Sequence, residues 1–435
     1  MAPEKISIPL ALAVGLGAII GAGIFVLSGT AIAIAGGYAL LAFVLVGIVA
    51  IFVGLEMGEL SSLMPNEVGA SYSFVYRAFG SELGFVTGIL LFFSYATSIS
   101  VISLGFGSYL SSILALGNAF NIPFAIILIF ILSILNILGI KKAAKSDAVL
   151  VAIKVSILLL FIVATLAISL LNKTFSVSNF SAPNNAILSV FSASVVIFFA
   201  YSGFQSISTF TSRIKGKNGA AKAIILATVI SLILYVLVVF SLLALMPASE
   251  YKISGDPLSF ALKTSHAPRW LFITVDIGAL IATTSATIAM ILSSSRMLYQ
   301  ISKDKLLPRI FRKYNEESDV AVNSVIVSAI IGVIMLFSGN IYTIAAISNF
   351  GLLFSYIMTS FALIHFRRSG YKASFSMPLY PYLPIITIIF LFAFLFGMPK
   401  ESLLIGAILI ILLLAIYYML KEIKRKKPVM IKLFD

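Results

Sequence analysis

The chain is poor in cysteine, histidine and charged residues, which most often build catalytic and metal sites. Its 435 residues include no cysteine, two histidines and only 11% charged residues. The lack of cysteine excludes disulfides and thiolate metal sites, and His266 and His365 alone cannot form a histidine-rich metal site. No segment matches Gly-x-x-x-x-Gly-Lys-Ser/Thr, the phosphate loop expected in an ATP-driven pump. No nucleophile–base pair can be assembled either, so we expect no enzyme, no metal and no cofactor.

Apolar residues take the place of the missing polar ones. They make up 60% of the chain, and the mean hydropathy is +1.12. Soluble domains carry roughly 25% charged residues, whereas a membrane-spanning helix needs about 20 mainly apolar ones. We therefore expect an all-α polytopic protein of the cell membrane. Its twelve predicted spans are 6–29, 36–62, 84–112, 120–139, 147–171, 186–211, 222–246, 269–298, 321–337, 341–365, 379–397 and 402–420.

Connections rich in Lys and Arg alternate with connections that hold few, and this alternation predicts how the chain is oriented in the membrane. They concentrate in the even-numbered connections and in the tail 421–435, while the odd-numbered connections hold few. Basic residues favour the cytoplasmic side of a membrane, so the N- and C-termini are both predicted to be cytoplasmic. This accounts for the net charge of +14 without a nucleic-acid partner. The run Lys424–Lys427 is expected to be a stop-transfer anchor, with binding of anionic lipid as the alternative.

Two of the spans contain small residues where a membrane helix should be continuous. The first span includes Gly17-Ala-Ile-Ile-Gly21-Ala-Gly23-Ile-Phe25, and the sixth includes Phe198-Phe-Ala-Tyr-Ser-Gly-Phe204. In lipid, a broken helix is tolerated only where it is buried in protein or lines a cavity. Secondary transporters bind their substrates at such breaks. The alternative is close helix packing, because Gly17 and Gly21 also form a small-xxx-small pair.

The breaks lie five spans apart, which suggests an internal repeat. An odd number of helices in each repeat inverts the second copy relative to the first. We predict a first five-helix repeat over residues 1–171 and an inverted repeat over 186–366. Two further helices over 379–420 and a basic cytoplasmic tail over 421–435 complete the chain.

Lys154 is an ionisable residue inside an apolar span, and such residues are candidate functional groups. It lies about two turns into the fifth span, where it could snorkel to the interface. Alternatively it points into the helix bundle, where burial favours the neutral amine and allows proton exchange. Its possible partners there are the hydroxyls of Thr283, Thr284 and Ser285 in the eighth span.

Three carboxylates also lie inside predicted spans, away from the first and last residues of those spans. Glu56 and Glu59 are one turn apart near the cytoplasmic end of the second span. We expect them to be gate or helix-end groups rather than metal ligands, because no histidine or further carboxylate accompanies them. Asp276 lies in the outer part of the eighth span, and we expect it to be a solvated vestibule residue.

Four motifs resemble those of the amino acid–polyamine–organocation superfamily of transporters, in the right order and over essentially the whole chain. The motifs are Gly21-Ala-Gly23-Ile-Phe25; Glu59-Leu-Ser-Ser-Leu-Met-Pro65 with Gly69-Ala-Ser-Tyr72 and Ala78-Phe-Gly80; Phe199-Ala-Tyr-Ser-Gly-Phe204; and Ser293-Ser-Ser-Arg-Met-Leu-Tyr299 with Lys303-Asp-Lys-Leu-Leu-Pro308. The resemblance implies a five-plus-five inverted fold like that of sodium-coupled leucine transporters. It also implies substrates that are amino acids, polyamines or related organocations.

The same resemblance implies roles for residues at both breaks and on the fifth helix. The carboxylate of the substrate would lie on backbone N–H groups, and its amino group would face backbone carbonyls. The implied N–H groups are those of Gly21, Ala22 and Gly23, and the implied carbonyls are near Ile19, Ile20, Phe199, Ala200 and Ser202. Phe199 would be an aromatic lid, and Lys154 matches a lysine of proton-coupled members whose ammonium replaces a sodium ion. The stretch Thr211–Asn218 departs from the family, because it lacks the usual acidic residue and Asn-Pro pair.

We therefore expect a secondary transporter that moves amino acids by proton symport with alternating access. No acidic residue lies near either break in the sequence, so a neutral substrate is favoured over a cationic one. The expected partners are the amino acid, protons and membrane lipid. Two alternatives stay open: an exchanger without net proton coupling, and an amino-acid sensor that transports nothing.

Overall fold

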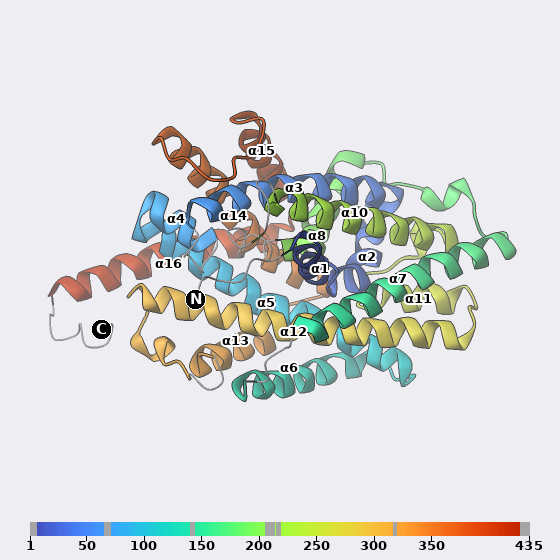
Figure 1. The fold of residues 1–435 in the computed structure, drawn as a ribbon. Coiled ribbons are helices and arrows are strands. Elements are labelled where there is room, and N and C mark those ends of the chain that lie inside the picture. Colours follow the sequence, from blue (N-terminus) through green and yellow to red (C-terminus); the bar gives the residue numbers. More distant parts are fainter. Residues whose placement is uncertain are drawn as a thin grey trace.

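The computed structural model describes residues 7–64, 71–139, 144–204, 214, 219–315 and 320–426, and these residues are mainly helical (Figure 1). Each of the predicted spans overlaps a helix or a pair of helices. These helices are α1 (Ile8–Ile19) with α2 (Gly23–Ala35), α3 (Ala39–Leu63), α5 (Ser81–Ile113), α6 (Asn121–Ile137), α7 (Ala144–Leu171), α8 (Ala186–Tyr201), α10 (Gly219–Leu245), α12 (Arg269–Lys303), α13 (Val322–Met335), α14 (Ile341–Arg368), α15 (Tyr382–Phe396) and α16 (Lys400–Lys426).

Helix length and composition identify a multi-pass membrane protein. Within the described ranges, eight helical stretches are long and apolar enough to cross a membrane, and one of these joins α2 and α3. The helices α1, α8, α13 and α15 are apolar but shorter, at 10–17 residues. For α1 and α8 the reason is local, because each ends at one of the small-residue breaks.

The predicted spans differ from the structure at both breaks and in two connections. The helix after the first break continues to Ala35 instead of ending at residue 29. In the sixth span α8 ends at Tyr201, and residues 205–211 lie outside the described part. Two short helices were not predicted: α4 (Ser71–Phe79) and α11 (Pro257–Thr264). The proline at the first position of α11 has no N–H to leave unpaired, which favours a helix start there.

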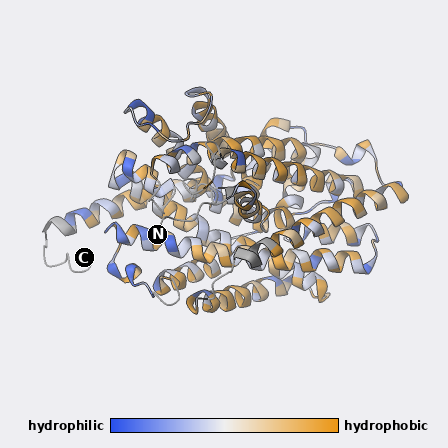
Figure 2. Cartoon of the chain, viewed as in Figure 1, coloured by the Kyte–Doolittle hydropathy of each residue, from blue (hydrophilic) through white to orange (hydrophobic). Residues whose placement is uncertain are grey.

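The outward faces of the helices are apolar, as a lipid environment requires. Large side chains such as Phe130, Val163 and Ile411 are more than half exposed. A soluble protein would rarely expose apolar patches of this extent. Figure 2 shows hydrophobic residues along the lengths of the helices and most of the hydrophilic ones towards the ends of the bundle.

The broken helices occupy the middle of the bundle. Figure 1 shows α1, α2 and α8 near its centre, with α4 and α16 towards one end and α11 towards the other. Nearly every residue of α2 is buried, as expected for a helix that is apolar all round. It packs against α8, while α1 packs against α10 and α7. The fold therefore brings the two breaks together in its interior.

Candidate functional site

The first break separates α1 from α2 by the residues Ile20 to Ala22. The Gly21 N–H donates to the carbonyl of Ile19 at 2.7 Å, which makes a tight turn. Helical bonding resumes when the Val26 N–H donates to the Ala22 carbonyl at 3.0 Å. The first N–H groups of any helix lack an intrahelical acceptor, and the helix dipole adds a partial positive charge there. The start of α2 can therefore bind an anion, although the Gly21 N–H already has a partner.

The second break follows α8, where a 3-10 turn, η4 (Ser202–Phe204), replaces the α-helix. The hydroxyl of Ser202 donates to the carbonyl of Phe199 at 2.8 Å, so this carbonyl is already bonded. Phe199 and Ala200 are both buried. The departure from the family pattern at Thr211–Asn218 lies outside the described residues, apart from Ile214.

The two breaks touch each other through glycine. A Cβ atom added to Gly23 would overlap Ala200, and one added to Gly203 would overlap the backbone of Ala18. By contrast, a Cβ atom on Gly21 would lie 3.8 Å from the Cβ of Ala286 on α12, an ordinary contact. Close packing therefore explains why positions 23 and 203 are glycine, but it does not explain the glycine at position 21.

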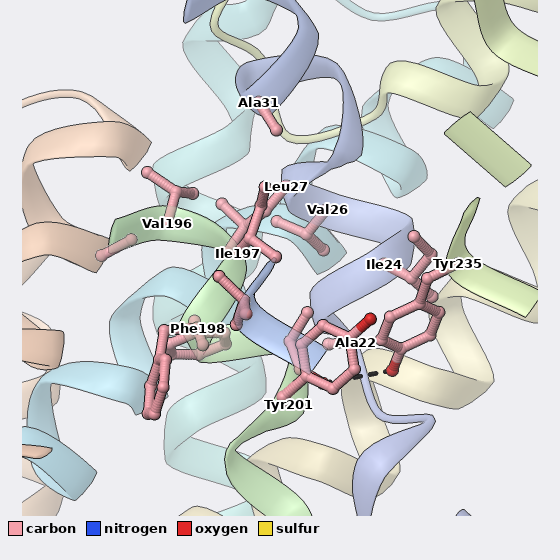
Figure 3. Packing of buried hydrophobic residues seen from close by; sticks show 14 of the residues in the cluster. Ala22, Ile24, Val26, Leu27, Ala31, Val196, Ile197, Phe198, Tyr201 and Tyr235 are labelled. Atoms are coloured by element: carbon pink, nitrogen blue, oxygen red, sulfur yellow. Dashed lines mark hydrogen bonds between the residues drawn. The ribbon is translucent and has the colours of Figure 1, made fainter. Parts of the chain in front are cut away.

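Tyr235 of α10 joins the two breaks, and the sequence analysis missed it. Its hydroxyl lies 2.7 Å from the carbonyl oxygen of Ile19 and 3.1 Å from that of Ala200, and its single hydrogen is shared between the two carbonyls. Its ring packs edge-on against Tyr201 at 5.1 Å between centroids, and Figure 3 shows the two rings near Ala22 at the start of α2. The sequence could have pointed to Tyr235, because it is a tyrosine in the middle of the seventh predicted span.

Lys154 is buried, with 2% of its surface exposed. Val151, one turn before it on α7, lies against Gly17 of α1. Ile157, about one turn after it, lies against Gly278 of α12. The face of α7 that carries Lys154 is therefore directed towards α1 and α12. This placement favours the bundle-interior interpretation over snorkelling, while the coupling role stays a prediction.

The hydroxyls predicted as partners of Lys154 lie on the part of α12 that passes the first break. The Thr283 hydroxyl is buried and donates to the carbonyl of Ala279 at 2.7 Å. This bond is the usual i−4 pattern, and it leaves the oxygen able to accept from another donor. Thr284 and Ser285 are partly buried. The roles of all three hydroxyls stay predictions.

Glu59 is buried and forms an ion pair with Arg367, whose side chain is 19% exposed. Arg367, at the end of α14, donates from Nε and Nη2 to the two carboxylate oxygens of Glu59, each at 2.6 Å. The N–H of Met377 also donates to Glu59. One turn away on α3, Glu56 is fully buried and accepts a bond from the Ser360 hydroxyl. Both carboxylates therefore tie α3 to α14, and the sequence analysis did not identify Arg367.

Asp276 is not a solvated vestibule residue, so that expectation was wrong. None of its surface is exposed. Its Oδ2 atom accepts hydrogen bonds from Ser112 at 3.1 Å and from Ser259 at 3.0 Å. Ser259 belongs to α11, the short helix that the sequence did not predict. The packing of α11 against α12 buries the carboxylate.

Glu56 and Asp276 both lie far from the level of the breaks. Asp276 precedes Ala286 by ten residues on α12, which corresponds to about 15 Å. On α3, the carbonyl of Phe43 marks the level of the second break, because it accepts a hydrogen bond from Tyr201 at 3.2 Å. Glu56 lies thirteen residues further along α3, which corresponds to about 20 Å. Within the described ranges, no group of three or more His, Cys, Asp or Glu residues could hold a metal ion.

Comparisons with known proteins place the chain among membrane transporters. A family model described as amino acid permease matches residues 6–420. The methylthioribose transporter of Bacillus subtilis (strain 168) is 29% identical over 413 residues, which cover 88% of this chain and 86% of that protein.

Two further proteins of that strain are similar. The branched-chain amino acid permease BcaP is 28% identical and the serine/threonine exchanger SteT is 26% identical; the alignments cover 86% and 88% of this chain, and 84% and 89% of those proteins. A crystal structure of a mutant manganese transporter from Eremococcus coleocola shares the fold, with a TM-score of 0.60, 14% identity and coverage of 94% and 93% of the two chains. The chain belongs to the amino acid permease family, which consists of membrane transporters and not of enzymes.

Proposed function

We propose that the protein is a secondary active transporter that moves neutral amino acids across the cytoplasmic membrane by proton symport. The observation that carries this proposal is the contact between the two helix breaks. The start of α2 presents helix N–H groups beside the residues of α8 that precede its own break. An amino acid carries its carboxylate and its ammonium on the same carbon atom, so it needs an anion site next to carbonyl oxygens.

The proposed substrate site uses the start of α2 for the carboxylate. Ala22 and Gly23 are the proposed donors, and Gly21 is proposed to let the substrate approach them, because a Cβ atom there would meet only ordinary contacts at 3.6–3.9 Å. For the ammonium, the carbonyls of Ile19 and Ala200 are the proposed acceptors. Tyr235 now bonds both of them, so its hydroxyl would share these oxygens with the substrate or move away.

The preference for a neutral substrate rests on the lack of an acidic residue near either break in the sequence. The buried carboxylates Glu56 and Asp276 lie about 15 to 20 Å along their helices from the level of the breaks. A cationic side chain bound at the breaks would pay a large desolvation cost without a partner.

We propose Lys154 as the proton carrier. In its charged form it would bridge α7 to α1 and α12, with Thr283, Thr284 and Ser285 as acceptors. In its neutral form it would release this contact and allow the bundle to move. Protonation biases an equilibrium between two access states only when the two states bind the proton with different affinity. The burial of Lys154 on the face of α7 that meets α1 and α12 supports such a difference.

The proposed topology has twelve spans, two inverted five-helix repeats and both termini in the cytoplasm. The match between each predicted span and a helix supports this count. The breaks after α1 and after α8 occupy the first helix of the repeats 1–171 and 186–366. The helices α15 and α16 follow the second repeat.

The proposal is tested by ligand binding and then by transport. Purified protein should be screened for thermal stabilisation by the common amino acids, methylthioribose and polyamines. A ligand at 100 times its Kd stabilises the folded state by about 2.7 kcal/mol. We expect neutral amino acids to raise the Tm, and stabilisation by polyamines alone would contradict the proposed site.

Counterflow in liposomes then separates a transporter from its main alternative. Preloaded unlabelled substrate should draw labelled substrate into the vesicles, which a sensor would not do. An exchanger without proton coupling would also show counterflow, so uptake driven by a proton gradient is needed to distinguish it.

A further inference from the structure

A cavity of about 720 Å³ lies between α5, α14 and α16, away from the helix breaks. Its walls are largely apolar and include Leu83 of α5, Phe361 of α14 and Leu414 of α16. Phe361 is 41% exposed, so the cavity lies at the surface of the bundle that faces lipid. We refer to it as the α14 groove.

The α14 groove is apolar along its length and basic at one end. Its lining on α14 begins at Phe354 and reaches Arg368, fourteen residues later, which corresponds to about 21 Å. The basic end is formed by His365 and Arg368, followed by the hydroxyl-bearing Ser369. The hydrocarbon core of a bilayer is about 30 Å thick. The groove therefore has the length for the acyl chain of a single leaflet, with a cationic group where α14 ends.

The two consecutive arginines of α14 have different environments. Arg367 is directed towards α3, where it holds Glu59. Arg368 is exposed and lines the groove, and no carboxylate of the described residues forms an ion pair with it. The nearby carboxylate of Glu82 instead accepts a hydrogen bond from Tyr418 at 2.8 Å. A guanidinium binds phosphate in a bidentate manner more readily than an ammonium does.

We propose that the α14 groove binds an anionic phospholipid, with its phosphate on Arg368 and an acyl chain against Leu83, Phe361 and Leu414. A zwitterionic lipid fits the same apolar walls, but its ammonium offsets the attraction between its phosphate and Arg368. The bound lipid also holds the end of α14, directly beside the Glu59–Arg367 ion pair. Occupancy of the groove therefore strengthens the tie between α14 and α3.

The test compares two lipids with the same acyl chains on the purified full-length protein. Binding of phosphatidylglycerol and phosphatidylcholine is measured by native mass spectrometry after delipidation. We expect phosphatidylglycerol to bind about tenfold more tightly, a difference of about 1.4 kcal/mol. Arg368→Gln should remove this preference. Arg309→Gln is the matched control, because Arg309 is exposed and does not line the groove, and it should leave the preference unchanged.

A second variant tests the apolar part of the groove without changing its charge. Leu83→Trp places a larger side chain in the cavity and should weaken both lipids at least threefold. Glycerol phosphate, which has the anionic group but no acyl chain, should not compete. The proposal is overturned if the two lipids bind equally, if Arg368→Gln keeps the preference, if Leu83→Trp binds like the wild type, or if glycerol phosphate displaces the lipid.

Discussion

Gly21 and Gly23 differ in their surroundings, and this difference decides which residue can test the substrate site. A methyl group on Gly21 meets only ordinary contacts, whereas one on Gly23 overlaps Ala200. We expect Gly21→Ala to keep its Tm and to lose at least tenfold in substrate affinity, because the methyl group occupies the proposed approach to the N–H groups. Gly23→Ala should lose about 1–3 kcal/mol of stability through overpacking.

Thermal unfolding with and without substrate separates the two effects. Wild-type affinity in a folded Gly21→Ala protein would mean that the first break serves helix packing alone.

Tyr235 gives a second prediction at the scale of one residue. Tyr235→Phe removes the hydroxyl that bonds the carbonyls of Ile19 and Ala200 but keeps the ring. Because these carbonyls are the proposed ammonium acceptors, the substitution should change substrate affinity severalfold in binding titrations. Tyr201→Phe is the matched control, since its hydroxyl bonds Phe43 on α3. Equal changes in affinity for the two variants would argue against the proposed acceptors.

Among the elements, α3 and α14 are joined by the ion pair between the buried Glu59 and the partly exposed Arg367. Removing a single partner from such a pair costs about 3–5 kcal/mol, because the other charge stays buried. Arg367→Gln should therefore lower the Tm strongly. The double variant Glu59→Gln/Arg367→Gln should recover part of the loss, since no uncompensated charge remains. A double-mutant cycle by thermal unfolding measures the coupling, and additive losses would show that the two side chains act independently.

The elements also show what could be predicted from the sequence. Long apolar runs such as 84–112 and 341–365 predict α5 and α14 closely, because a membrane helix requires that length. The helix α11 has only eight residues of mixed polarity, so no periodicity identifies it. The burial of Asp276 depends on α11 and was missed for the same reason.

For the candidate site, the sequence predicts where the helices break but not which residues meet there. The glycines mark both breaks, since glycine in a helix interior costs about 1 kcal/mol. Their mutual contact and the bonds of Tyr235 arise from the packing of segments far apart in the chain. No local pattern encodes that packing, so the pairing of Glu59 with Arg367 was missed as well.

For the whole molecule, the proposed topology predicts which ends of the bundle face outwards. The loop that contains Ser254 precedes α11, and Ser146 lies at the start of α7. A cysteine at Ser254 should react with an impermeant thiol reagent in intact cells, and one at Ser146 should react only after the membrane is opened. The chain has no native cysteine to interfere. Labelling of Ser146→Cys in intact cells would show that the orientation is opposite to the proposed one.

The central claim is that a proton gradient drives amino acid uptake through Lys154. The most direct measurement is uptake of the best-binding neutral amino acid by liposomes that contain the purified protein, with the outside more acidic than the inside. We predict that the wild type accumulates substrate above the external concentration and loses it when an ionophore collapses the gradient. Lys154→Ala should bind substrate and fail to accumulate it. Accumulation by Lys154→Ala, or none by the wild type despite active counterflow, would contradict the account.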